Sequence, residues 1–257
     1  MRVGDITAAI EQFAPLSIQE GWDNSGLCIG APGDEVHSVL LGFDCTPELI
    51  DEAVEKGCDM VVTHHPLIFK GLKRIQGGDP VSDAVICAVR AGVAVYAAHT
   101  SADKVIAGVS GAMARRLGLH DIAVMEDEGG FGLGAVGTLP HPMTGEEAIA
   151  YVKERFHLPH LRCSKPVERV EKVAMCGGAG ASEIEAARAT GAQLYISGDV
   201  SYHHFFTPEG FMVMDIGHFE SEVDIVEILY KVIREKFPTF AVRISENLGR
   251  SNPVRYY

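Results

Sequence analysis

The sequence lacks several features that would place it outside the ordinary globular class. No stretch approaches about 18 consecutive apolar residues, so we expect no membrane-spanning helix. The N-terminus, Met1-Arg-Val-Gly-Asp-Ile6, has no uninterrupted apolar segment, so we expect no secretory signal peptide. Cys-x-x-Cys pairs are absent, and the 6 scattered cysteines of this 257-residue chain predict reduced thiols and a cytoplasmic location.

Positive charge is scarce as well, because 22 Lys and Arg stand against 35 Asp and Glu, a formal net charge of −13. Binding to a nucleic-acid backbone depends on clustered Lys and Arg that displace counterions. Bulk nucleic-acid binding is therefore not expected. A small phosphate-bearing substrate stays open, since metal ions would supply positive charge locally.

Predicted strands and helices alternate along most of the chain. Strands are predicted at residues 38–43, 60–63, 92–98, 132–139, 172–176, 193–197 and 211–215. Helices are predicted at residues 5–13, 46–56, 81–90, 103–117, 145–156, 182–190 and 219–236. This alternation indicates βα units and largely parallel sheets, hence an α/β fold. The only tryptophan, Trp22, precedes turn-forming residues, which we interpret as a tight turn pinned by a packed indole.

The two halves of the chain look alike. Laying Val39 on Val173 without a gap places strand on strand, helix on helix and Gly57 on Gly191. The stretch Asp127-Glu-Gly-Gly130 is the best candidate junction. We therefore predict two similar α/β repeats, residues 1–126 and 127–257.

Two consecutive histidines, His64 and His65, follow the β-branched strand at residues 60–63. Pro66 biases the backbone of His65 away from helix, so an extended loop would let the two imidazoles diverge. A lone histidine here would be a polar strand end. Two of them favour metal ligation.

Similar signals follow later strands. His99-x-x-x-Asp103 has a counterpart in His218-x-x-x-Glu222, and residues four apart at a helix start share one face. Each has a plainer explanation: Asp103 would form a capping box with Thr100, Glu222 would complement a helix N-terminus, and His218 would be half-buried and hydrogen-bonded. Ligands of open α/β sheets gather at the carboxyl ends of strands. The coincidence at such ends favours one metal site: His64, His65, Asp103, His218 and Glu222.

Three imidazoles and two carboxylates exceed the three protein ligands usual for catalytic zinc. They suit two divalent ions that share a bridging carboxylate and a solvent oxygen. Zinc, iron, manganese, cobalt and nickel all accept such mixed nitrogen and oxygen ligands, so the identity of the metal stays open.

Six motifs make the chain resemble the Nif-three-like dinuclear metal centre family, whose members are also called GTP cyclohydrolase 1 type 2 homologues. They are Glu20-Gly-Trp-Asp-Asn-Ser-Gly-Leu27, Thr63-His-His-Pro-Leu-Ile-Phe69, His99-Thr-Ser-Ala-Asp103, Cys176-Gly-Gly-Ala-Gly180, Ser197-Gly-Asp-Val-Ser-Tyr-His203 and Asp215-Ile-Gly-His-Phe-Glu-Ser-Glu222. The resemblance implies that the five residues above bind the metals, with Glu222 touching both. It also implies two intertwined α/β repeats with small mixed sheets, and a toroidal homohexamer built as a trimer of dimers.

Other residues are candidates of lower rank. His203 matches a recurrent family histidine and is a candidate proton shuttle, although an ordinary histidine, on the surface or behind a metal ligand, is an equally good interpretation. His99 and His204 are candidates of the same rank. Asp44 and Asp199 end strands near the same edge and are candidates to orient ligand histidines. The turn at residues 177–180 is a candidate phosphate site, but close backbone packing explains it better.

Two functions follow. The first is a metal-dependent hydrolase, in which a metal-bridged hydroxide attacks a small, nucleotide-like substrate; the family name suggests GTP ring opening. The alternative is a non-catalytic metal-handling or regulatory scaffold protein.

Overall fold

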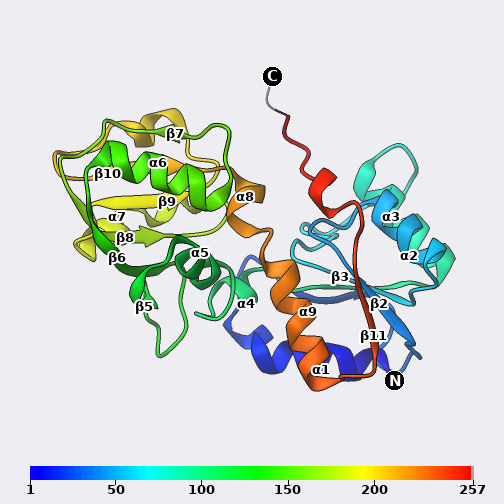
Figure 1. Cartoon of the computed structure of the whole chain (residues 1–257). Coiled ribbons are helices and arrows are strands. Elements are labelled where there is room, and N and C mark those ends of the chain that lie inside the picture. The colour runs from blue at the N-terminus through cyan, green and yellow to red at the C-terminus, as the bar shows by residue number, and fades with distance from the viewer. Residues whose placement is uncertain (256–257) are drawn as a thin grey trace. The chain divides into compact units, whose positions relative to one another are not determined.

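The computed structural model of the chain describes residues 1–255 and divides into two compact α/β units. Unit 1 consists of Met1–Ala102 together with the chain from Ile225 onward, and unit 2 is Asp103–Asp224 (Figure 1). The two units are thus intertwined along the sequence, as expected. Their borders differ from the junction at residues 126 and 127, so that division into repeats stays a prediction.

The sheet of unit 1 has the strand order β1-β4-β3-β2-β11. Its strands are β1 (Gly26–Ile29), β2 (Ser38–Leu41), β3 (Met60–Thr63), β4 (Ala94–Ala97) and β11 (Ala241–Ile244). All are parallel to their neighbours except β1, which is antiparallel to β4. The sheet is therefore mixed, and its parallel strands end at one edge.

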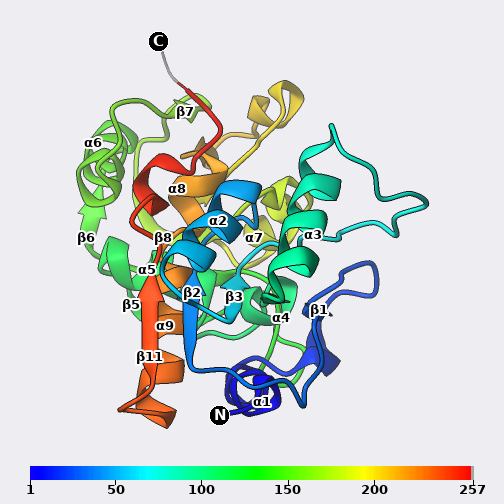
Figure 2. The ribbon, with the colours of Figure 1, turned by 90° about the vertical axis from the view of Figure 1, so that its right-hand side faces the viewer.

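Helices cover both faces of this sheet, with α2 (Pro47–Glu55) and α3 (Pro80–Ala91) on one side and α1 (Val3–Phe13) and α9 (Ile225–Lys236) on the other (Figures 1 and 2). A short turn, η1 (Leu16–Ile18), follows α1, and η4 (Leu248–Arg250) follows β11. The hydroxyl of Thr46 accepts a hydrogen bond from the Leu49 N–H at 3.3 Å and so caps the N-terminus of α2.

The sheet of unit 2 has the order β5-β6-β8-β9-β10-β7, with β8, β9 and β10 parallel and the remaining pairings antiparallel. Its strands are β5 (His120–Val124), β6 (Ala135–Met143), β7 (Arg162–Cys163), β8 (Val170–Met175), β9 (Leu194–Ser197) and β10 (Met212–Asp215). Helices α5 (Val109–Leu117) and α6 (Gly145–Phe156) pack on one face, and α7 (Ile184–Ala189) packs on the other. Short helical turns complete the unit, namely η2 (Gly180–Glu183), η3 (Tyr202–Phe205) and α8 (His218–Glu222), while α4 (Thr100–Asp103) contains the border between the units along the chain.

The repeat seen in the sequence recurs in the pairing of strands. Val39 of β2 pairs with Met60 of β3, and Val173 of β8 pairs with Leu194 of β9. The alignment that lays Val39 on Val173 also lays Met60 on Leu194. Both sheets therefore share a parallel core with the same register.

Two predicted helices are wrong in extent. The helix expected at residues 103–117 is broken, since α4 ends at Asp103 and α5 begins at Val109. The helix expected at residues 219–236 is likewise split into α8 and α9. Four strands were not predicted, namely β1, β5, β7 and β11.

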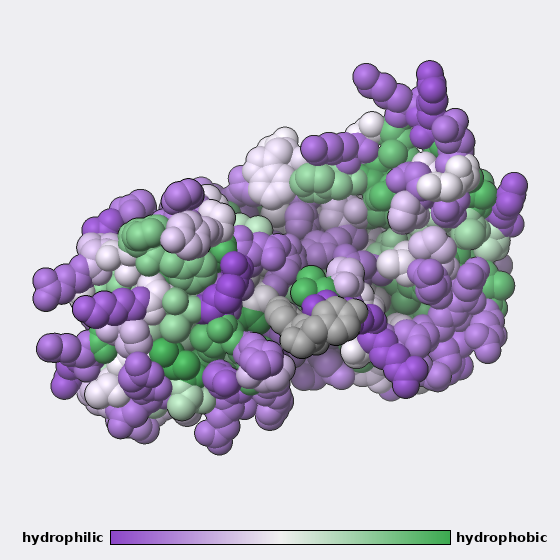
Figure 3. All heavy atoms as spheres, turned by 90° about the horizontal axis from the view of Figure 1, so that it is seen from above, coloured by the Kyte–Doolittle hydropathy of each residue, from purple (hydrophilic) through white to green (hydrophobic). Residues whose placement is uncertain are grey.

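On the face seen in Figure 3, hydrophilic residues are abundant and apolar residues lie between them. Within residues 1–255, no helix combines the length and the apolar character needed to cross a membrane. All 6 cysteines are free in the structure.

Candidate metal centre

Three histidines gather at the carboxyl ends of β3 and β4 in unit 1. His64 and His65 follow β3, and His99 follows β4. One ring nitrogen from each lies within 4.8 Å of the other two, close enough for a metal ion to be shared. His64 is fully buried, while His65 and His99 are partly exposed. The sequence ranked His99 below the other two, yet the structure groups it with them.

Hydrogen bonds fix how the first two imidazoles face. His64 Nδ1 lies 2.8 Å from the carbonyl oxygen of Ala98, which can only accept, so Nδ1 carries the hydrogen. His65 Nδ1 lies 2.7 Å from Asp44 Oδ1. A metal-binding histidine uses one nitrogen for the metal and donates its other N–H to such an acceptor. In both residues Nε2 is thus the nitrogen that would bind a metal.

Phe43, just after β2, holds the same pair from a second direction. Its carbonyl oxygen accepts hydrogen bonds from the N–H groups of His64 (3.1 Å) and His65 (3.3 Å). Its ring stacks on His64, with centroids 5.7 Å apart, and meets His65 at 4.7 Å in an edge contact. Phe43 was missed by sequence reasoning, because a phenylalanine next to a strand gives no signal beyond ordinary core packing.

His99 is oriented by a buried carboxylate. Asp23 Oδ1 lies 2.7 Å from His99 Nδ1, and Asp23 Oδ2 accepts from the Ser25 hydroxyl (2.8 Å) and from the N–H and hydroxyl of Thr100. Burial raises the pKa of Asp23, but the hydrogen bonds from His99, Thr100 and Ser25 outweigh it and bring that pKa below its ordinary value. Asp23 stays ionised, so it holds His99 firmly. The sequence indicated only a turn former at this position.

In unit 2, the carboxylate of Glu222 lies close to both Asp103 and His218. His218 Nε2 lies 3.0 Å from Glu222 Oε2, so the i and i+4 residues of α8 converge as the spacing predicted. A carboxylate oxygen of Asp103 lies within 4.8 Å of one of Glu222. His218 Nδ1 lies 2.9 Å from Asp199 Oδ2. Asp44 and Asp199 are thus within hydrogen-bond distance of His65 and His218, the contacts that their predicted orienting roles require.

Glycines let the backbone approach this group closely. A Cβ atom at Gly178, whose φ is +60°, would lie 2.2 Å from Glu222 Oε1. A Cβ at Gly198 would lie 2.8 Å from the backbone nitrogen of His218. The turn at residues 177–180 thus serves close packing against Glu222, the explanation that the sequence favoured over a phosphate site.

The carboxylates of unit 2 concentrate negative charge. Burial raises the pKa of the Cys176 thiol, and the charges of Asp103, Glu183 and Glu222 raise it further. Cys176 therefore stays a neutral thiol. The same repulsion between carboxylates would be relieved by a divalent cation.

The other two candidate histidines lie elsewhere. His203 is exposed on η3, where its ring lies 5.3 Å from Tyr202 and 6.4 Å from Phe206 between centroids. His204 is also exposed, with Nδ1 2.9 Å from the Ser201 hydroxyl. In the described part of the chain, neither belongs to a group of potential metal donors.

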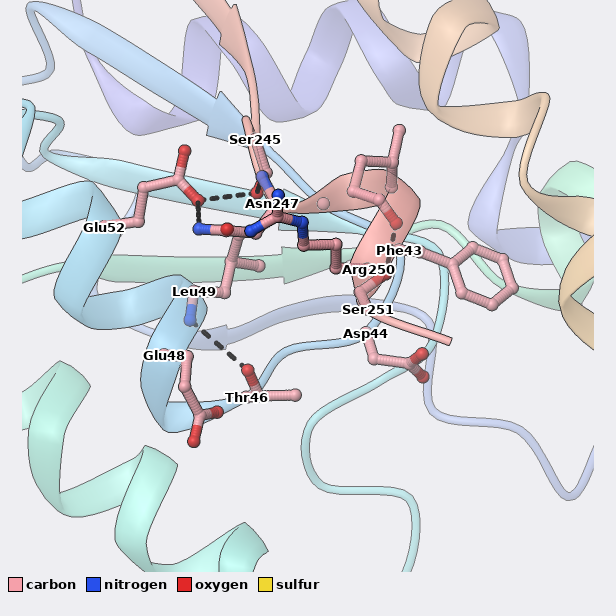
Figure 4. Close-up of a pocket in the computed structure, with 12 residues that line it drawn as sticks. Phe43, Asp44, Thr46, Glu48, Leu49, Glu52, Ser245, Asn247, Arg250 and Ser251 are labelled. Carbon is pink, nitrogen blue, oxygen red and sulfur yellow. Dashed lines mark hydrogen bonds between the residues drawn. The ribbon is translucent and has the colours of Figure 1, made fainter. Parts of the chain in front are cut away.

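A cavity of about 370 Å³ lies in unit 1 behind Phe43 and Asp44 (Figure 4). The start of α2 and residues 245–251 form its other walls. Glu52 joins these walls, since its Oε2 accepts from the Ser245 hydroxyl (2.6 Å) and from Asn247 Nδ2 (3.2 Å). The size is that of small-molecule sites, roughly 300–1,000 Å³. Asp44 thus contacts both this cavity and His65.

The chain matches a known protein family over almost its whole length. Residues 1–253 match the model of the Duf34/NIF3 (NGG1p interacting factor 3) family, and the chain belongs to that family. The resemblance read from the motifs is confirmed.

Individual relatives cover the chain almost completely. A Clostridium acetobutylicum protein is 34% identical over 238 residues, which span 90% of this chain and 89% of that protein. A Streptococcus pneumoniae protein is 32% identical over the full length of both chains. Each is named "GTP cyclohydrolase 1 type 2 homolog".

Solved structures show the same fold. The Staphylococcus aureus hypothetical protein SA1388 superposes with a TM-score of 0.92 at 24% identity, covering 100% of this chain and 99% of that one. Reduced HcgD from Methanocaldococcus jannaschii gives a TM-score of 0.80 at 26% identity, covering 96% and 98%.

Proposed function

We propose that this protein is a metal-dependent hydrolase whose centre holds two divalent ions. The ligands are His64, His65, Asp103, His218 and Glu222. One observation carries the proposal: the Nδ1 atoms of all three histidines face oxygen acceptors, namely the Ala98 carbonyl, Asp44 and Asp199, so that each Nε2 is the metal-binding nitrogen.

The donor chemistry of the proposed ligands supports a dinuclear centre. The proposed ligands from unit 1 are imidazoles, whereas those from unit 2 are one imidazole and two carboxylates. Imidazoles bind one metal each, while a carboxylate can bridge two, and we assign the bridging role to Glu222. Zinc, iron, manganese, cobalt and nickel fit this donor set.

The reaction we propose is hydrolysis of a small, nucleotide-like molecule. The bound ions would lower the pKa of solvent and polarise a substrate oxygen. The protein residues hold the ligands in place: Asp44 and Asp199 fix two imidazoles, and the glycine turn at residues 177–180 seats Glu222. His203 stays our candidate for moving a proton to the leaving group. The names of the relatives make GTP the first substrate to assay.

The test uses protein purified with its native metal. Elemental analysis should find two ions per chain, and turnover of GTP and of phosphodiesters should be lost in His65→Ala and in Glu222→Gln. Matched controls are His160→Ala and Glu154→Gln, both at exposed positions, which should keep activity and metal. Undiminished turnover in either ligand variant would show that the proposed site is wrong.

A metal-handling or regulatory scaffold protein is the second candidate. One observation favours it: His203, the only candidate for a proton shuttle, is exposed. Within residues 1–255, His203 also belongs to none of the groups of potential metal donors. Readily exchangeable metal without turnover on any substrate would support this function.

The assembly expected from the resemblance and the cytoplasmic location expected from the scattered cysteines also stay predictions. A trimer of dimers would give a mass of six chains of 27.7 kDa in light scattering, and a single-chain or dimer mass would contradict it. The cytoplasmic location is tested by cell fractionation.

A further inference from the structure

The only tryptophan of the chain faces solvent. Trp22 is 60% exposed, which corrects the packed indole expected from the sequence. The turn beside it is nevertheless firmly held: Asp23 binds Ser25, His99 and Thr100, and Asn24 Nδ2 donates to the Ile68 carbonyl at 2.6 Å. The indole is therefore presented outward from a rigid turn.

Two further rings stand next to Trp22. Phe69, which is 43% exposed, lies 5.9 Å from Trp22 between ring centroids, at 67°. His99 lies 6.2 Å from Trp22 and 6.1 Å from Phe69, at 71° and 86°. These three residues, here called the aromatic corner, are steeply inclined to one another and leave much of the indole open.

The aromatic corner adjoins the donor group of unit 1. The His99 centroid lies 5.4 Å from those of both His64 and His65. His99 therefore contacts both the two exposed rings and the two proposed metal ligands. Exposed aromatic surface at a preorganised position of this kind marks a binding site.

We propose that Trp22 and Phe69 bind a planar heteroaromatic ring of the substrate, stacked on the indole beside the histidine cluster. This inference rests on the proposed function, because it names the part of the substrate that the hydrolase would hold. A flat ring suits the indole, since every heteroaromatic ring offers a π face for stacking. In a chain of net charge −13, a neutral ring also meets no electrostatic barrier.

Because Trp22 is the only tryptophan, its fluorescence reports on this site alone. The probes are adenosine and uridine as planar rings, ribose as the same sugar without a base, and tetramethylammonium as a cation that aromatic corners also attract. We expect saturable quenching by adenosine, weaker quenching by uridine and none by ribose or tetramethylammonium. Bound adenosine should also protect Trp22 from quenching by acrylamide.

Variants separate stacking from general exposure. Phe69→Ala should weaken adenosine binding by about fivefold or more, the effect expected for loss of one stacking partner. Phe69→Tyr should restore it. The matched control is Ile75→Ala, an exposed apolar residue six positions further along the same loop, which should bind adenosine as the unaltered protein does.

Three results would overturn the inference. The first is the absence of saturable quenching by adenosine and by uridine, in metal-loaded and in metal-free protein. The second is binding of tetramethylammonium in preference to adenosine. The third is protection from acrylamide that depends only on protein concentration, which would show that a second copy of the chain covers Trp22. Adenosine binding by a protein that turns over no substrate would contradict the proposed hydrolase activity alone. Turnover without ring binding would contradict the aromatic corner alone.

Discussion

Single hydrogen bonds decide which imidazole nitrogen each histidine offers. The carboxylate partners Asp44 and Asp199 could be predicted from the sequence, because each follows a strand at the edge where the histidines emerge. The partner of His64 is the Ala98 carbonyl, and a backbone oxygen leaves no trace in residue type. Asp23 was hidden for another reason: its partners Thr100 and His99 lie more than 70 residues away.

Asp44→Asn should reduce metal affinity by about 10–100-fold, the usual effect of removing the acceptor behind a ligand histidine. The amide cannot stabilise charge on His65, and it can turn its NH2 toward Nδ1 and favour the tautomer that carries hydrogen on Nε2. Zinc titration against a chromophoric chelator measures the change. Asp51→Asn, the same substitution at an exposed position on α2, is the control. Equal affinities in the two variants would refute the orienting role.

A carboxyl pair in unit 2 predicts a pH effect. A hydrogen bond with Glu183, then burial and the charges of Glu183 and Glu128, raise the pKa of Glu126 to about 7, while Lys104 opposes the shift. The folded state thus binds a proton more tightly than the unfolded state between the ordinary value of 4.5 and about 7. The free energy of unfolding therefore falls as pH rises through this window.

Glu126→Gln should remove this pH dependence. Relative to the unaltered protein, the variant should gain thermal stability between pH 5 and pH 8, measured by calorimetry on metal-free protein. The gain should shrink in high salt, because Glu126 is exposed and its charge interactions are screened. Glu154→Gln on α6 provides the control and should show no such gain. If the stability of both variants changed with pH in the same way, the raised pKa of Glu126 would be contradicted.

Among helices and strands, position in the sheet determines which could be predicted. The parallel core strands β2, β3, β4, β8, β9 and β10 were all expected, because strands buried on both faces read as continuous apolar runs. The four strands that were missed, β1, β5, β7 and β11, are the edges of the two sheets. Edge strands are partly exposed, so their apolar pattern is weak.

The two helices predicted with the wrong extent share one cause. One break lies between α4 and α5, next to the border at Ala102 and Asp103, and the other between α8 and α9, next to the border at Asp224 and Ile225. The helical spacing of apolar residues continues through both breaks, because this spacing depends only on which residues are apolar. It carries no information on which unit those residues pack against.

The turn after β8 offers a clean test of backbone space. Gly178→Ala should lower stability by about 1 kcal/mol for its left-handed φ, and it should also reduce metal affinity, since the new methyl group would displace Glu222. Gly191→Ala is the matched control: its φ is +80°, but nothing lies within 4 Å of the added Cβ. The control should lose stability and keep metal affinity. Metal titration of both variants measures the two affinities. Equal affinities would show that Gly178 is not needed to place Glu222.

For the whole molecule, the sequence predicted the repeated parallel core and placed the candidate ligands at strand ends, since both follow from local patterns. It did not predict the unit borders. The chain crosses from unit 1 to unit 2 inside α4 and returns after α8, where no composition change or linker marks the crossing. Asp103, expected with His64 and His65 in the first half, accordingly belongs to unit 2.

The proposed centre draws ligands from both units, so metal removal should change how the whole chain unfolds. Each unit has its own core and could unfold separately, whereas an ion bound by both would couple them. Metal at 100 times its Kd should add about 2.7 kcal/mol of stability. Calorimetry should show one transition with metal, and a lower, broader one after chelation. His65→Ala and Glu222→Gln should each abolish the gain, whereas His160→Ala should keep it. A metal-loaded protein whose melting is unaffected by chelation would contradict the proposed set of ligands.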